Sequence, residues 1–213
     1  MLAHYVREVQ ELTGDLTRRL DEIDAAAERW VQHDADVDRQ LCTPMSSADL
    51  GNFNQSLRRI DASQVAFFDA LEGFLAAWAR LSLLFFPGRG DSKTEVFRKD
   101  RASTLRSQLG ITDSSPLADR DLRNSWMHFD ERMDYMLANG HKFDRQRFVR
   151  SWQAKDFIGM VPRLMIIDTR TVYFLTQAGQ TKSVELSELR KVVDGLGERV
   201  ERWWETDPSV ESV

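Results

Sequence analysis

The chain has 213 residues, of which 42% are hydrophobic, so it can bury a substantial core as a single domain. Its formal net charge of −5 argues against a whole surface that coats nucleic acid, although a local basic site stays compatible with it. A single cysteine, Cys42, excludes an internal disulfide, and the first residues lack the basic and apolar stretches of a secretory signal. We therefore expect a cytoplasmic protein.

A long first helix is predicted from residue 2 to residue 31, because apolar residues recur there at steps of three and four. We expect it to fade in the acidic stretch from His33 to Asp38, which reads as a solvated turn rather than a calcium loop. Arg39 stands where such a loop needs glycine, and Met45 stands where it needs glutamate. The segment around Pro44 is expected to break the helical pattern.

A second helix is predicted from Asp61 to Phe86, with Asp61 and Gln64 arranged as a capping box. Its apolar stretch is long enough to suggest a membrane span, but three charged residues interrupt it: Asp69, Glu72 and Arg80. Charges inside hydrocarbon are costly, so we expect a buried bundle helix and no membrane partner. Its aromatic residues are expected in the core: Phe67, Phe68, Phe74, Trp78, Phe85 and Phe86.

Two further helices are predicted before the sequence changes character. One runs from Ser92 to Leu109 and is closed by Gly110. The next extends from Pro116 to Ala138, with Ser115 as its cap and an apolar stripe formed by Leu122, Trp126, Phe129, Met133 and Leu137. Two basic clusters, at residues 98–106 and 142–150, are either solvated faces or binding patches, and we prefer solvated faces.

The period of the sequence then becomes that of strands at residues 164–167, 172–175 and 181–186, and Ser187 is expected to cap a final helix. The fold class is therefore mainly α, with a small three-stranded antiparallel β-meander near the C-terminus. We divide the single domain, residues 1–213, into three parts. These are a long helix and connector (1–60), a helical core (61–140), and the meander with the C-terminal helix packed on the bundle (160–206).

The polar residues between Arg120 and Asp134 form the one constellation suited to chemistry. At about 100° per residue, one side of a helix carries Arg120, Asn124, His128 and Glu131, while the apolar stripe lies on another side. Arg123 lies about 140° from His128, so the two reach a shared groove from its flanks. The alternative for the same residues is a set of exposed ion pairs beside a half-buried histidine.

Arg123, Asn124 and His128 are similar to the Arg-polar-spacer-His motif of the HEPN superfamily. The segments from residue 59 to 64 and from 115 to 132 also look like a group of bacterial HEPN-like proteins, and the resemblance covers roughly residues 58 to 137. Asp130 departs from the pattern, because active members frequently carry an aromatic residue at that position.

The resemblance implies a HEPN-like helical bundle that assembles as a homodimer and cuts RNA without a metal or other cofactor. It implies catalytic roles for Arg123, Asn124 and His128, and we add Arg120, Glu131 and Arg132 as substrate-binding candidates. His128 would act as general acid or base, Arg123 would hold the scissile phosphate and Asn124 would orient either one. Such a nuclease would serve as a toxin or defence effector with a neutralising partner protein. The alternative is a non-catalytic helical module that binds a partner protein or a nucleotide through the same groove.

Overall fold

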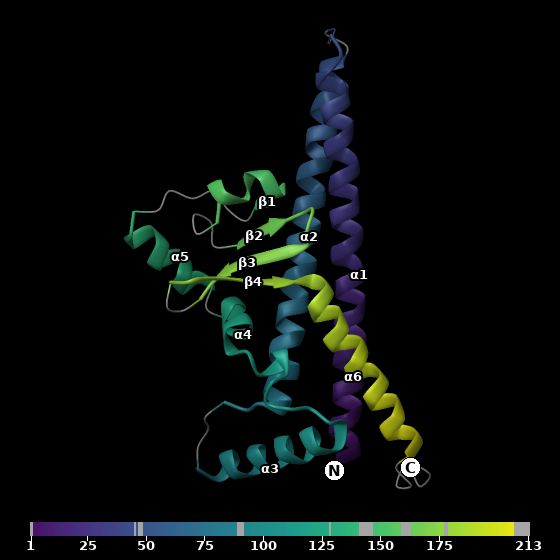
Figure 1. Ribbon diagram of the computed structural model, residues 1–213, viewed down its shortest axis with the longest axis vertical. Coiled ribbons are helices and arrows are strands. Elements are labelled where there is room, and N and C mark those ends of the chain that lie inside the picture. The colour runs from purple at the N-terminus through teal and green to yellow at the C-terminus, as the bar shows by residue number, and fades with distance from the viewer. Residues whose placement is uncertain are drawn as a thin grey trace.

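A computed structural model of the chain describes residues 2–44, 46, 49–88, 92–127, 129–140, 147–158, 163–176 and 179–206. It describes the backbone alone at residues 92, 93, 123, 125–127, 129, 130, 132, 133, 136 and 147. The described chain is mainly helical, with a small sheet close to the C-terminal helix (Figure 1). The predicted fold class is confirmed at this level.

Two long antiparallel helices, α1 (Leu2–Leu41) and α2 (Asp49–Phe85), pair as a hairpin along the long axis of the molecule (Figure 1). At 1.5 Å per residue, the 40 residues of α1 span about 60 Å. Both helices are longer than predicted, since the acidic stretch from His33 to Asp38 stays helical and α2 starts before Asp61. The boundary that we placed between residues 60 and 61 therefore falls inside α2.

The predicted capping box at Asp61 is wrong, because Asp61 is an exposed residue in the interior of α2. The helix starts instead at Asp49. Its carboxylate accepts hydrogen bonds from the backbone N–H and the hydroxyl of Ser46, at 2.7 and 2.6 Å. Near the same end of the hairpin, Gln40 Nε2 donates to Ser56 Oγ at 3.1 Å and links the two helices.

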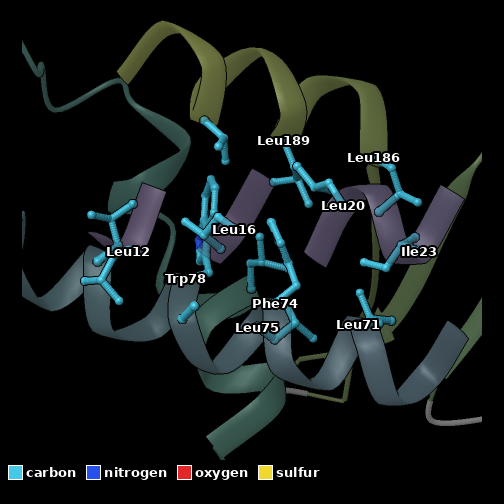
Figure 2. Close-up of a cluster of buried hydrophobic side chains, with 14 of the residues drawn as sticks. Leu12, Leu16, Leu20, Ile23, Leu71, Phe74, Leu75, Trp78, Leu186 and Leu189 are labelled. Atoms are coloured by element: carbon cyan, nitrogen blue, oxygen red, sulfur yellow. The ribbon is translucent and has the colours of Figure 1, made fainter. Parts of the chain in front are cut away.

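The main core lies where α1 and α2 meet α6 (Leu186–Thr206), as Figure 2 shows. Leu16, Leu20 and Ile23 of α1 point toward Phe74 and neighbouring side chains of α2, and all four are fully buried. The predicted apolar stripe of α1 is therefore confirmed. The last helix is also apolar on the side that faces this core, and its buried residues are Leu186, Leu189, Val193, Leu196, Val200 and Trp203.

The apolar part of α2 is a core element. The aromatic side chains from Phe67 to Phe85 that we expected in the core are buried, and Phe86 is partly buried against it. The three charged residues of this segment, Asp69, Glu72 and Arg80, are exposed. None of the described helices has a stretch long and apolar enough to cross a membrane.

The sheet has four strands in the order β1 (Arg147–Val149), β2 (Arg163–Ile166), β3 (Thr171–Leu175) and β4 (Thr181–Glu185). Strands β2, β3 and β4 pair antiparallel, whereas β1 pairs parallel to β2. The predicted three-stranded antiparallel sheet is thus corrected to a four-stranded mixed one. Phe148 of β1 packs edge-on against Phe67 of α2, with ring centroids 4.6 Å apart, and so joins the sheet to the hairpin.

The segment between the hairpin and the sheet begins with α3 (Ser92–Leu109), which lies across one end of the molecule (Figure 1). As predicted, Gly110 ends α3: its φ of +62° places it in the left-handed region, and Ile111 N–H donates to the Arg106 carbonyl at 2.9 Å. After α3 come a 3₁₀ turn, η1 (Pro116–Ala118), and the helices α4 (Arg120–Met127) and α5 (Phe129–Ala138). A second 3₁₀ helix, η2 (Ser151–Asp156), follows β1.

The predicted single helix from Pro116 to Ala138 is wrong at its start. Ser115 caps only the 3₁₀ turn, accepting from Leu117 N–H at 3.3 Å, and Asp119 is extended. Leu137, which we placed in the apolar stripe, is exposed. Ser187 does not cap the last helix either, because α6 begins at Leu186 and directly follows β4.

Candidate functional site

Helix α4 carries the first part of the predicted site and is fixed in place at its N-terminus. Asp119 Oδ1 accepts a hydrogen bond from Asp121 N–H at 2.7 Å and thereby satisfies one of the unpaired donors that every helix start leaves. Asp121 also pairs with Lys182 of β4, with Nζ and Oδ2 2.5 Å apart. The hydrogen bond from this ammonium group to Asp121 raises the pKa of Lys182 above its ordinary value.

The buried side of α4 packs against the sheet and against helices α2 and α6. Leu122 is 4% exposed, and a cavity of only about 10 Å³ separates it from neighbours such as Leu71, Val172 and Leu189. Arg163 of β2 lines the same small cavity and is itself buried, so a permanent cation lies close to α4. Close packing of this kind holds the exposed side of α4 in one orientation.

The described residues contain only part of the predicted catalytic set. Asn124 is half-buried on α4, one helical turn after Arg120. Arg123 belongs to the same helix, but its side chain lies outside the described part, and His128 lies entirely outside it. The relation of Arg123 to His128 therefore stays a prediction.

The predicted substrate-binding residues separate onto two described helices. Arg120 is exposed at the start of α4, whereas Glu131 is exposed on α5 and Arg132 is described there by its backbone alone. Figure 1 shows α4 beside α2 and α5 extending away from α2, toward the outer end of the sheet. At that end, the Tyr135 hydroxyl of α5 comes within 2.9 Å of the position that a Cβ would occupy at Gly179.

A groove of about 440 Å³ lies beside Arg120, between the end of α2 and one side of α3, and we call it the Arg120 groove. Its apolar wall is formed by Phe85, Phe86 and Pro87 at the end of α2. The opposite wall comes from α3, and the residues that it contributes are Lys99, Asp100, Ala102, Ser103 and Arg106. Three cations and one carboxylate thus line the groove, which gives it a net positive character.

The three cations of the Arg120 groove differ in how firmly they are held. Arg106 forms an ion pair with Asp113, and its guanidinium carbon lies 5.1 Å from the centroid of the Phe86 ring. Lys99 pairs with Glu95 at 2.6 Å on the exposed surface of α3. Arg120 forms no ion pair with any residue in the described part of the chain. Exposed ion pairs contribute about 0 to 1 kcal/mol, so all three cations stay open to an anionic ligand.

The sequence alone does not indicate that Arg120 lies beside the basic residues of α3. We treated residues 98–106 as a solvated face, although the cluster of positive charge was visible in the sequence. The juxtaposition depends on the turn from Gly110 to Asp119, which brings the chain back to the end of α2. The spacing of residues within a helix does not predict such a turn.

Within the described ranges, no group of three or more histidine, cysteine or acidic residues is placed to hold a metal ion. Comparison with known proteins adds no relative, since no family model, curated protein or solved structure matches the chain.

Proposed function

We propose that the protein is a metal-independent RNA endonuclease of the HEPN type. The observation that supports this most directly is the Arg120 groove, which places Arg106 and Lys99 beside the first residue of α4, the helix that carries Arg123 and Asn124 of the motif. Phosphate contacts supply much of the affinity of proteins for nucleic acids, and guanidinium groups suit them well. A local positive groove on a chain of net charge −5 provides that contact at one place.

In the proposed reaction the ribose 2′-oxygen attacks the adjacent phosphorus and the bond from phosphorus to the 5′-oxygen breaks. The imidazole of His128 takes or supplies a proton, because it titrates near neutral pH. Arg123 stabilises the charge that develops on the phosphate, and Asn124 orients one of the two groups. The products are a 2′,3′-cyclic phosphate and a free 5′-hydroxyl.

The assembly and the cellular role form part of the same proposal. Two chains associate around a two-fold axis near the segment from Pro116 to Ala138, so that two copies of Arg123 and His128 face one cleft. The nuclease acts as a toxin or defence effector, and a partner protein neutralises it by covering that cleft. Arg120, Glu131 and Arg132 bind the RNA on either side of the cut.

The test is cleavage of a labelled RNA by the purified full chain in the presence of a chelator. We expect cleavage to persist and to leave a 2′,3′-cyclic phosphate. His128→Ala should lower the rate by about 10²- to 10⁴-fold through loss of proton transfer. Arg123→Lys should also fail, because a point charge does not reproduce a two-pronged phosphate contact.

His33→Ala is the matched control, since His33 lies on α1 in the hairpin, outside the Arg120 groove. It should cleave at the wild-type rate. If His128→Ala cleaves as fast as the His33→Ala control, the observed activity does not belong to the proposed site, and the nuclease assignment is wrong.

A second candidate function, a non-catalytic interaction module, is favoured by the free end of the hairpin. The last turns of α1 and the first turns of α2 project beyond the sheet (Figure 1), and three leucines there are exposed: Leu41, Leu50 and Leu57. Exposed apolar side chains on a projecting element are typical of protein contacts. If the wild-type chain cuts no RNA, and replacing these leucines with serine abolishes capture of a partner that the His128→Ala chain still captures, this module takes the place of the nuclease.

A further inference from the structure

A second groove lies on the other side of α3 from the Arg120 groove. It measures about 260 Å³, and its lining comes from the start of α1 and from α3: Leu2, Tyr5, Phe97, Asp100, Arg101 and Thr104. The Phe97 ring is 46% exposed there, although aromatic side chains of this size are usually well covered. We call this hollow the Phe97 groove.

Two contacts of Arg101 hold the side chains that line the Phe97 groove in place. The Arg101 guanidinium lies over the Tyr5 ring, 5.2 Å from its centroid, and Arg101 Nη2 donates to the Leu83 carbonyl at 3.2 Å. One face of Tyr5 is therefore occupied, whereas Phe97 stays open to solvent. The Thr104 hydroxyl donates to the Asp100 carbonyl at 2.9 Å, and its oxygen can still accept a hydrogen bond from a ligand.

The two grooves are adjacent, because Asp100 lines both of them. Both grooves are also lined by residues of α3, a helix with a positive net charge. Helix α3 carries five basic residues (Lys93, Arg98, Lys99, Arg101 and Arg106) against two acidic ones (Glu95 and Asp100), a net charge of +3 in a chain of net charge −5. The sequence outside α3 thus carries −8, and α3 stands out as a cationic ridge.

We infer that single-stranded RNA crosses α3, with its phosphates in the Arg120 groove and one base stacked on Phe97. This subsite rests on the proposed function for its choice of RNA, but it concerns binding and not cleavage. Cations on one side of a ridge and an open aromatic ring on the other form the combination that single-stranded nucleic acids require. A hollow of 260 Å³ is small for a ligand pocket and suits a single base.

Asp100, between the grooves, would repel a phosphate but accept hydrogen bonds from a base. A carboxylate takes hydrogen bonds from exocyclic amino groups, such as that of cytosine. The carboxylate therefore favours a base over the backbone at this point of the strand. A base with an amino group should bind there better than uracil.

The experiment measures binding of a fluorescent single-stranded 2′-O-methyl RNA of about ten nucleotides, a length within the usual range for such sites. This probe lacks the 2′-hydroxyl, so it cannot be cut by the proposed reaction. Phe97→Ala in the full chain should weaken binding by about 5- to 100-fold through loss of base stacking. Phe97→Trp should bind as well as wild type, and Phe97→Leu should bind as poorly as Phe97→Ala.

Two further variants separate stacking from other causes. Trp152→Ala removes a more exposed aromatic ring, 73% exposed on η2, which lines neither groove, and it should leave affinity unchanged. Arg106→Gln should flatten the dependence of log affinity on log salt by about one phosphate contact.

The outcomes for the subsite and for the nuclease are distinct. If Phe97→Ala binds the probe as tightly as wild type while wild type still cuts RNA, the subsite is wrong and the nuclease proposal stands. If Phe97 governs binding but no RNA is cut, the subsite stands as part of a binding protein. If Phe97→Leu binds like wild type, the groove recognises apolar shape and the stacking proposal is overturned.

Discussion

The hydroxyl of Ser82, near the end of α2, donates a buried hydrogen bond to the backbone carbonyl of Leu117, with the two oxygens 2.7 Å apart. Leu117 belongs to the 3₁₀ turn that precedes α4 and is itself fully buried. This bond fixes the turn against α2. The position of Arg120, three residues later, therefore depends on a polar side chain within a mainly apolar stretch of α2.

Ser82→Ala should lower the free energy of unfolding by about 1 to 3 kcal/mol, because it leaves the Leu117 carbonyl buried without its donor. Urea denaturation followed by circular dichroism measures the change. The matched control is Ser107→Ala, on the exposed surface of α3, which should change stability by less than about 0.5 kcal/mol. Equal effects of the two substitutions would contradict the structural role of Ser82.

The long helices could be predicted from the sequence because their apolar residues repeat every three to four positions. Their ends could not, since helix ends depend on local hydrogen bonds. Asp61 and Gln64 match a capping pattern but lie inside α2, whereas Asp49 bonds to Ser46 in a segment that reads as a loop. Strand β1 was missed because three residues are too few to show an alternating pattern.

Leu20→Ala and Leu137→Ala test where the core ends. Leu20 is buried among α1, α2 and α6, so truncation should cost about 2 to 5 kcal/mol through a cavity and lost apolar contact. Leu137 continues the apolar spacing of its segment but is exposed, and the same substitution should cost less than about 0.5 kcal/mol. Thermal unfolding of both variants measures the two losses of stability. A loss of stability for Leu137→Ala as large as that for Leu20→Ala would place Leu137 in the core.

Two glycines should respond in opposite directions to alanine. Gly195 lies inside α6, and no atom lies within 4 Å of the position that an alanine methyl group would occupy, so Gly195→Ala should stabilise the chain by about 0.5 to 1 kcal/mol. Gly110 has a φ of +62° at the end of α3, where alanine is strained, and Gly110→Ala should destabilise by about 1 kcal/mol. Chemical denaturation measures both. Stabilisation by Gly110→Ala would contradict the left-handed cap.

Asp168 should make stability depend on acid pH. Burial by itself raises its pKa, but hydrogen bonds from Ser151 N–H at 2.7 Å and from the Arg150 guanidinium at 3.1 Å outweigh it and hold the pKa below 3.8. A lowered folded pKa stabilises the protein above the unfolded pKa, and this contribution is lost as pH falls through the folded pKa. Asp168→Asn should therefore differ most from wild type above about pH 5, and the difference should shrink below 3.8.

The control for this pH series is Glu205→Gln, which removes an exposed carboxylate at the end of α6. Its unfolding free energy should run parallel to that of wild type across the same range. A constant gap between Asp168→Asn and wild type down to the lowest pH would show that the Ser151 and Arg150 bonds do not depend on the charge of Asp168.

The candidate site was predictable only where it follows one helix. Arg120 and Asn124 stand four residues apart, and that spacing places them on the same side of α4. The contribution of Arg106 and Phe86 to the groove comes from a meeting of α3 with the end of α2, and such contacts between distant segments leave no periodic signal. The residues that surround a motif are thus harder to predict than the motif.

Arg120→Ala should separate substrate binding from catalysis in the proposed nuclease. Arg120 lies at the start of α4, three residues before Arg123. In the proposed complex it would contact a phosphate that does not react, so its contribution would be the same in the ground state and in the transition state. Its loss should raise KM by about 10- to 100-fold, the value of a charged hydrogen bond, and leave kcat unchanged. Arg123→Lys should instead lower kcat, because Arg123 acts on the phosphate that carries the developing charge. Steady-state cleavage of a short RNA in chelator gives both constants. A fall in kcat for Arg120→Ala at unchanged KM would place Arg120 at the reacting phosphate and overturn its assignment to the flank of the site.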